Sequence, residues 1–348
     1  MNRKIKFGVF ADLHIDIMPD PLERLEVFLQ AAKRENVDFI IELGDFCYPD
    51  KNRKCVCPVE KLPANVKNAL MVKTYADTEK IRDLFNNFEK PSYHVLGNHE
   101  CDMCSKKETT EFIGFNGATF YSFDMGGFHF IVLDASYYKK NGTYHTFENG
   151  NYFAEGFDFK IEENGGERLL PYIPPEQLNW LKEDLAKTKL PSVVFSHQCL
   201  MENNDFSVAN ASVVKQILKN APNGVVACFN GHEHVDYEAF QDGIWFVNIN
   251  SISNTWIGEE FEYKGLYGEE TDEKYPNVRY TVPFRDAVYA IIEIDEDGIN
   301  ICGTQSEYVG PTPKERGVYN PDSWWMKSDK RDLMLTASIK SRYLCFKK

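Results

Sequence analysis

Five short groups of polar residues combine side chains that bind metal ions in proteins. They are Asp12-x-His14, Gly44-Asp45, Gly97-Asn98-His99-Glu100, His197 and Gly231-His232-x-His234. The chain of 348 residues has only eight histidines, and five of them lie in these groups. Imidazole together with carboxylate suits Mn, Fe, Zn or Ni, whereas an all-oxygen site would suggest Mg or Ca. The residue types therefore predict a site for divalent transition metal ions.

Each group follows a short apolar run that is typical of a β-strand. The runs cover residues 5–10, 38–42, 92–96, 192–195 and 224–229. Helical patterns around Leu22–Leu29 and around residues 66–88 separate the first three runs, which predicts βαβ units with a parallel or mixed sheet. Open α/β sheets place their sites at the carboxyl ends of the strands. We therefore expect the five groups to converge at one rim.

Taken singly, the members of these groups also have structural interpretations. Asp12 and Asp45 could cap helices at strand-to-helix turns, and Asn98 could be a turn residue. Glu100 could be a surface charge or belong to the first turn of a helix, and His197 has little motif context of its own. The presence of all five groups in one chain favours the metal site over these alternatives.

The second half of the chain is rich in predicted β-structure. The elements expected there are a hairpin at 120–133, a helix from Pro174 to about Lys187, and strands at 243–249, 287–294 and 298–303. Two aromatic-rich insertions, at about 137–172 and 254–284, are expected to be irregular and to cover the rim. Their rings could stack on a base or sugar of a substrate, or could pack the insertions against the core.

The order D-x-H, G-D, G-N-H-E, H and G-H-x-H resembles the calcineurin-like metallophosphoesterase superfamily over residues 12–234. The resemblance implies an α/β fold, a metallophosphatase-like four-layer α/β/β/α sandwich with two mixed β-sheets. We expect one catalytic domain over residues 1–305 that carries both insertions. Residues 306–348, with Trp324-Trp325, are expected to form a C-terminal extension packed on that domain.

The resemblance also implies two divalent transition metal ions and the ligands of each. Asp12, His14, Asp45 and His234 would hold the first ion, and Asp45, Asn98, His197 and His232 would hold the second. Two cations about 3.5–4 Å apart need an anion between them, and the family pattern gives that role to Asp45. A hydroxide that bridges the ions would attack phosphorus in line, while His99 acts as general acid or orients the phosphate.

The chain departs from the family pattern near His99. Many members read G-D-x-x-D, where the last Asp orients the general-acid histidine, but this chain has Tyr48 at that position. Asp50 or Glu100 could replace that carboxylate, or His99 could have no carboxylate partner. The tyrosine spacing is similar to that of purple acid phosphatases, in which a tyrosine binds iron, but those enzymes lack a histidine equivalent to His14. We therefore expect Tyr48 to lie behind the ligands or in the core.

Composition limits the classes of partner. The 39 basic and 53 acidic side chains give a net charge of −14 with no basic stripe, so no nucleic-acid partner is expected. No run of about 18 apolar residues is present, so no membrane span is expected, and the N-terminus does not continue as a signal peptide. Nine scattered cysteines do not suggest a disulfide scaffold. We therefore expect a cytoplasmic protein with reduced thiols.

Other cysteines and histidines are given no catalytic role. Cys101-x-x-Cys104 and Cys55-x-Cys57 could form a redox pair or a zinc site, but the spacing is atypical for zinc. We expect reduced surface thiols at these positions. The remaining histidines, expected to be structural or surface residues, are His94, His129 and His145.

These observations predict a metal-dependent phosphoesterase. The expected substrate is a phosphate ester or phosphoanhydride of a small molecule, with nucleotide derivatives among the candidates. The alternatives are a phosphoprotein phosphatase and a non-catalytic scaffold built on the same fold. A scaffold would be expected to lose ligands or the acid histidine, and this chain keeps all seven predicted ligands and His99.

Overall fold

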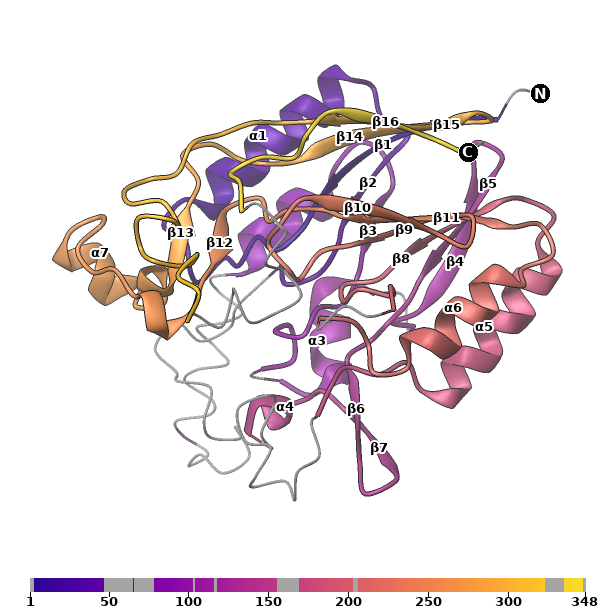
Figure 1. Cartoon of the computed structure of the whole chain (residues 1–348), viewed down its shortest axis with the longest axis horizontal. Coiled ribbons are helices and arrows are strands. Elements are labelled where there is room, and N and C mark those ends of the chain that lie inside the picture. The colour runs from indigo at the N-terminus through magenta and orange to yellow at the C-terminus, as the bar shows by residue number, and fades with distance from the viewer. Residues whose placement is uncertain are drawn as a thin grey trace.

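Two six-stranded β-sheets dominate the computed structural model (Figure 1). The structure describes residues 3–46, 65, 78–102, 104–115, 118–154, 169–202, 206–322 and 335–346. The first sheet has the order β16 (Arg342–Cys345), β15 (Gly298–Gly303), β14 (Ala290–Asp295), β1 (Lys4–Phe10), β2 (Phe39–Glu42) and β3 (Ser92–His94). The second has the order β10 (Tyr237–Gln241), β11 (Ile244–Asn248), β9 (Val225–Asn230), β8 (Ser192–Phe195), β5 (Phe128–Val132) and β4 (Tyr121–Met125).

Both sheets are mixed, with parallel strands at the positions that matter for the site. Strands β1, β2 and β3 are parallel to one another, and β14 joins β1 in the antiparallel sense. In the second sheet β5, β8, β9 and β11 are parallel, while β4 and β10 are antiparallel edge strands. The carboxyl ends of β1, β2 and β3 therefore share one edge of their sheet, as do those of β8 and β9.

Helices cover the outer face of each sheet. Helix α1 (Pro21–Arg34) and the helical residues 78–86 pack on the first sheet through a cluster that includes Phe10, Phe28 and Phe85. Helices α5 (Pro175–Lys187) and α6 (Ala211–Lys219) pack on the second. The inner faces meet in the largest core cluster. This arrangement confirms the expected four-layer α/β/β/α sandwich with two mixed β-sheets.

Strand β1 shows how alternating side chains divide between these layers. Phe7 and Val9 point into the core between the sheets, because successive side chains of a strand face opposite sides. Gly8 faces α1, where an added Cβ would lie 3.0 Å from the Phe28 ring. The absence of a side chain at Gly8 thus lets the helix approach the sheet closely.

Smaller elements fill the connections. They are α3 (Lys106–Ile113), β6 (Tyr137–Lys140), β7 (Thr143–Thr146), α4 (Asn151–Ala154), β12 (Asn254–Trp256), η2 (Glu259–Phe261), α7 (Glu269–Lys274), η3 (Val278–Tyr280) and β13 (Thr281–Pro283). The expectation that insertions 137–172 and 254–284 are irregular is therefore wrong for their described residues, which leave out 155–168. Asn141-Gly142 has positive φ at both residues and turns β6 into β7, which is the geometry of a two-residue hairpin loop.

Other expectations differ from the structure in detail. Val27, assigned to the buried face of α1, has 47% of its surface exposed. The helix expected around residues 66–88 is described from residue 78 onwards, and Trp324-Trp325 lies outside the described residues. Strand β16 within the expected C-terminal extension pairs with β15 and so completes the edge of the first sheet. Within the described ranges, no helix has the length and apolar character needed to cross a membrane.

Phe7 is the centre of the contact between the sheets. Its ring stacks on Phe39 at 4.8 Å and meets the rings of Phe195 and Phe229 edge-on at 5.8 and 5.9 Å. Phe7→Ala should lower the free energy of unfolding by about 3–5 kcal/mol, because it leaves a cavity between two sheets that cannot move together to fill it. Urea unfolding measures this loss. The exposed Val27→Ala should change stability by less than about 0.5 kcal/mol, and equal losses would contradict the interpretation.

Candidate metal centre

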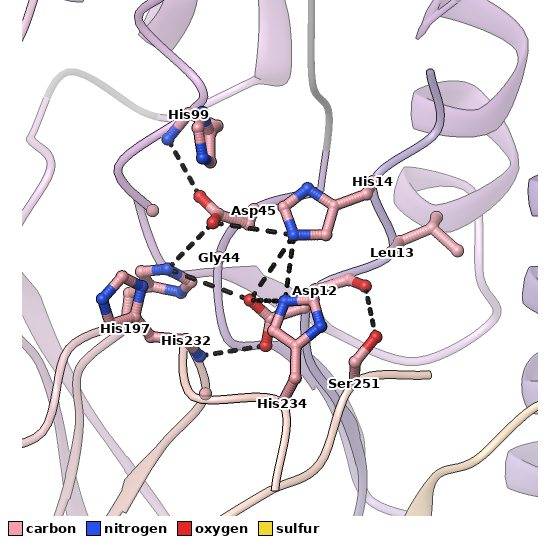
Figure 2. Close-up of polar contacts among 12 residues, drawn as sticks. Asp12, Leu13, His14, Gly44, Asp45, His99, His197, His232, His234 and Ser251 are labelled. Carbon is pink, nitrogen blue, oxygen red and sulfur yellow. Dashed lines mark hydrogen bonds and ion pairs between the residues drawn. The ribbon is translucent and has the colours of Figure 1, made fainter. Parts of the chain in front are cut away.

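Asp12, His14 and His234 form the first of two clusters of possible metal ligands (Figure 2). Asp12 and His14 follow β1, and His234 follows β9. The Nε2 atoms of His14 and His234 are 3.2 Å apart, and His234 Nε2 lies 3.4 Å from Asp12 Oδ1. Asp12 Oδ1 is buried and accepts no hydrogen bond from any residue that the structure describes. These atoms face a common point, which suits a cation.

The second cluster contains Asp45, His197 and His232. His197 Nε2 lies 3.2 Å from Asp45 Oδ2 and 2.9 Å from Asn98 Oδ1. These residues follow β2, β8, β9 and β3, so they come from both sheets. The expectation of one rim holds for the position of the site, but the rim is formed by two sheets that meet.

Asp45 lies between the clusters. Its Oδ2 is 3.8 Å from His14 Nε2 in the first cluster as well as 3.2 Å from His197 Nε2 in the second. In Figure 2 the carboxylate points toward both imidazoles. The donor set, imidazole with carboxylate and one amide, suits divalent transition metals. The residues thus fit a pair of such ions, with Asp45 placed where a shared ligand is needed.

The turns that carry the ligands have an unusual backbone. Five of the seven predicted ligands have φ between +48° and +71°, namely Asp12, His14, Asp45, His232 and His234. Such left-handed geometry costs a residue other than glycine about 1–3 kcal/mol and concentrates at functional sites. Gly97 is required by a close approach instead, because an added Cβ would overlap Asp45 Oδ1. These tight turns bring aspartate and histidine side chains from the ends of separate strands together at the two ligand clusters.

Backbone carbonyl groups orient two of the histidines. His197 Nδ1 donates to the carbonyl of Leu43 at 2.7 Å, and His234 Nδ1 donates to that of Asn254 at 2.9 Å. When Nδ1 carries the proton, the neutral ring presents the Nε2 lone pair, which is the metal-binding form. Both Nε2 atoms point into the clusters.

Charge at the centre favours a cation. Burial opposes ionisation of Asp45, but the imidazoles of His197 and His99 outweigh it and hold the pKa of Asp45 well below its usual range. Burial likewise lowers the pKa of His197, and Asp45 outweighs this and raises it to about 10. The carboxylate is thus ionised and attracts positive charge, which metal ions can supply in place of protons.

Serine and glutamate side chains that hold the ligand turns were not found from the sequence. Ser251 Oγ donates to the carbonyl of Asp12 at 2.9 Å. Glu100 accepts hydrogen bonds from the amides of Phe46 and Gly97, both at 2.6 Å, and from that of Asp45 at 3.2 Å. The alternative that Glu100 is a surface charge is therefore wrong: the residue is 3% exposed and joins two ligand turns.

The carboxylate partner of His99 is Asp102, which the sequence interpretation missed. His99 Nδ1 donates to Asp102 Oδ2 at 2.8 Å, and the amide of His99 donates to Asp45 Oδ1 at 2.9 Å. Burial lowers the pKa of His99, but the charges of Asp102 and Asp45 outweigh it and raise the pKa. Glu100 does not fill this role. Tyr48 and Asp50 lie outside the described residues.

The two candidate ligand clusters contain none of the described cysteines and none of the remaining histidines. Cys101 and Cys104 are buried, so the prediction of surface thiols is wrong for this pair, and burial raises the pKa of the Cys101 thiol. Cys55 and Cys57 lie outside the described residues. The other histidines have structural or surface positions: His94 bonds to Glu42 and Asn86, His129 bridges Asp124 and Asp184, and His145 stacks on Tyr138.

The arrangement predicts how metal binding responds to substitution. We expect the wild-type chain to bind two Mn²⁺ ions, and Asp45→Asn to weaken both because its carboxylate faces both clusters. His14→Gln should weaken the binding of one ion selectively. The loss of affinity should be at least about 10–100-fold, because loss of a residue that only hydrogen-bonds to a ligand already costs that much. Calorimetric titration of metal-stripped protein measures both affinities. The exposed His145→Gln is the matched control, and a similar loss in that variant would contradict the assignment.

Comparisons with known proteins agree with this geometry. A sequence model of the calcineurin-like phosphoesterase family matches residues 5–236. A manganese-dependent ADP-ribose/CDP-alcohol diphosphatase of Oryza sativa subsp. japonica is 24% identical over an alignment of 269 residues, and the match covers 66% of this chain and 77% of that protein. The crystal structure of a dimetal phosphatase from Danio rerio is similar with a TM-score of 0.55 and 15% identity, covering 88% of this chain and 99% of that one.

The family match spans more than half of the chain and includes all seven predicted ligands. It confirms the family resemblance that the motifs indicate. Members of this family are hydrolases of phosphoric ester bonds that use two divalent metal ions. The structural similarity supports the same sandwich fold. The chain belongs to the calcineurin-like phosphoesterase family.

Proposed function

We propose that this phosphoesterase hydrolyses a diphosphate bond in a small nucleotide-derived molecule. The observation that carries the proposal is the pair of adjoining ligand clusters that share Asp45, with His99 beside them. The diphosphatase from Oryza sativa subsp. japonica, similar to this chain over 269 residues, supports the substrate class.

The proposed ligands form two sets, one for each metal ion. Asp12, His14 and His234 would hold one ion and Asn98, His197 and His232 would hold the other, with Asp45 as a ligand of both. When bound, the ions polarise the phosphoryl oxygens and make water a better nucleophile near neutral pH. The carbonyl groups that accept from Nδ1 of His197 and His234 fix these rings, so that each Nε2 atom is available as a metal ligand within its cluster.

His99 is placed to assist the leaving group. Its ring centroid lies 5.8 Å from that of His14, so it borders the first cluster without joining it. Asp102 accepts a hydrogen bond from Nδ1, and in the protonated ring Nε2 would donate a proton to the leaving oxygen or to a phosphoryl oxygen.

The insertions are proposed to contact the remote part of the substrate. Tyr138, Phe147 and Tyr152 are buried together, so these rings pack the first insertion against the body. In the second insertion the half-buried Trp256 packs against Ile17 and Met18, which lie shortly after His14. Trp256 is therefore the better candidate for a ring beside the substrate.

Hydrolysis assays test the proposed reaction. Metal-stripped protein is given Mn²⁺, Fe²⁺, Zn²⁺, Ni²⁺ or Mg²⁺ and offered ADP-ribose, a CDP-alcohol, AMP, a phosphopeptide and the nitrophenyl mono- and diesters. We expect a transition metal to restore cleavage of the diphosphates, and Asp45→Asn to abolish it. Preferential cleavage of the phosphopeptide would instead identify a phosphoprotein phosphatase. Absence of any hydrolysis by protein that holds two metal ions would contradict the proposal.

Asp102→Asn tests the assignment of His99. We expect kcat to fall about 10–100-fold for substrates with a poor leaving group, because the histidine loses the carboxylate that fixes its tautomer and favours its protonated form. The loss should be much smaller for nitrophenyl esters, whose leaving group needs little protonation. Asp124→Asn, at the separate His129 pair, is the matched control. A loss independent of the leaving group would show that Asp102 only supports the turn.

A further inference from the structure

The C-terminal segment 335–346 contacts the chain immediately after the turn that carries His234. This segment lies outside the family match, which ends at residue 236. It contains β16, whose position at the edge of the first sheet is seen in Figure 1. The last residue of the match, Asp236, lies two residues after His234, and the segment contacts this residue directly.

Asp236 and Arg342 form a buried, two-point ion pair. The side chain of Asp236 is 1% exposed and that of Arg342 is 13% exposed. The two terminal nitrogens of Arg342 donate to the two Asp236 oxygens at 2.8 and 2.9 Å, and the amide of Lys340 donates to Asp236 Oδ2 at 2.8 Å. Arg342 Nε also lies 2.8 Å from Glu238 on β10. Such fork-shaped pairing fixes orientation as well as distance.

Asn250 forms a second anchor for the same segment. Asn250 Nδ2 donates to the carbonyl groups of Thr336 at 2.7 Å and Ser338 at 3.1 Å. Asn250 Oδ1 accepts from the amide of Ser251, whose hydroxyl donates to the carbonyl of Asp12. A chain of three hydrogen bonds therefore runs from the C-terminal segment to Asp12.

Both anchors lead to ligands of the first cluster. Arg342 and Lys340 act through Asp236 on the turn of His234, and Asn250 acts through Ser251 on the turn of Asp12. We propose that segment 335–346 is a clamp that positions the ligands of the first metal ion, with Arg342 as its main positioning residue. The inference rests on the proposed metal centre and adds a part of this chain that the family match does not include.

The charges explain why the effect should be selective. Without Arg342 the Asp236 carboxylate would be buried beside Glu238 with no cation, which is costly, so the turn would move toward water. His234 lies two residues from Asp236 and would move with it. His232, four residues from Asp236 on the same turn, is held by its amide, which donates to Asp12 Oδ2 at 2.9 Å. Asp45 and His197 are held by Glu100 and by the carbonyl of Leu43. Partners outside the ligand shell commonly change metal affinity 10–100-fold.

Mn²⁺ titration of the full-length chain, followed by calorimetry and by electron paramagnetic resonance, tests the clamp. His14→Gln and His197→Gln serve as references that identify the signals of the first and second ions. We expect Arg342→Met to weaken the first ion at least tenfold and to leave the second unchanged. The double variant D236N/R342M should recover most of the loss, because it removes the unpaired buried charge. Arg285→Met, at an exposed ion pair with Glu307, is the matched control and should bind both ions normally.

The outcomes separate the clamp from a general effect on stability. Wild-type affinity for both ions in Arg342→Met, or equal weakening of both, would overturn the inference. If Arg342→Met does not fold, Arg342→Lys decides: it keeps the charge but not the fork, so selective weakening of the first ion supports the clamp and normal binding overturns it. Failure of the wild-type chain to bind two ions would instead refute the metal centre itself, independently of Arg342.

Discussion

The face-to-face packing of the two sheets is the constraint on which the centre depends. Phe7 of β1 contacts Phe195 of β8 and Phe229 of β9 across the interface, so three ligand-bearing strands are held together at or within three residues of their carboxyl ends. Metal ligands must be held to within a few tenths of an ångström of their proper distances. Close-packed aromatic rings provide such rigidity because they have few alternative arrangements. The core between the sheets thus fixes the site at its rim.

Electrostatic cost is concentrated at the same rim. Asp12 and Asp45 are buried, and each sits on a left-handed backbone residue. Backbone strain and the burial of charge both raise the free energy of the folded state. Favourable packing in the rest of the structure must offset this cost. Hydrogen bonds from Ser251 and to Glu100 hold the turns in place, but they do not neutralise the carboxylates. Bound cations would do so, and folding and metal binding are therefore expected to reinforce each other.

The local part of this organisation could be predicted from the sequence, and the long-range part could not. The ligand groups could be placed at strand ends because each group directly follows an apolar run. The Asn-Gly pair at 141–142 is typical of a hairpin turn, but the sequence analysis did not use it. Asp102 lies only three residues from His99, but nothing in the spacing distinguishes it from Glu100. The contact of Arg342 with Asp236 joins residues 106 positions apart, and only the folded sheets bring them together. Pairing at such separations depends on tertiary packing and leaves no local pattern.

The charge of the molecule helps to determine what the centre can accept. Two carboxylates and two divalent ions leave a local charge of about +2, while the chain as a whole carries −14. Fields from surface charges are screened over about 8 Å at physiological ionic strength, so a small anion inside the rim experiences mainly the ions. A long polyanion would also lie along the acidic surface and gain no counterion release from it. This charge balance is therefore compatible with the proposed diphosphate in the centre, and it gives no electrostatic advantage to a nucleic acid.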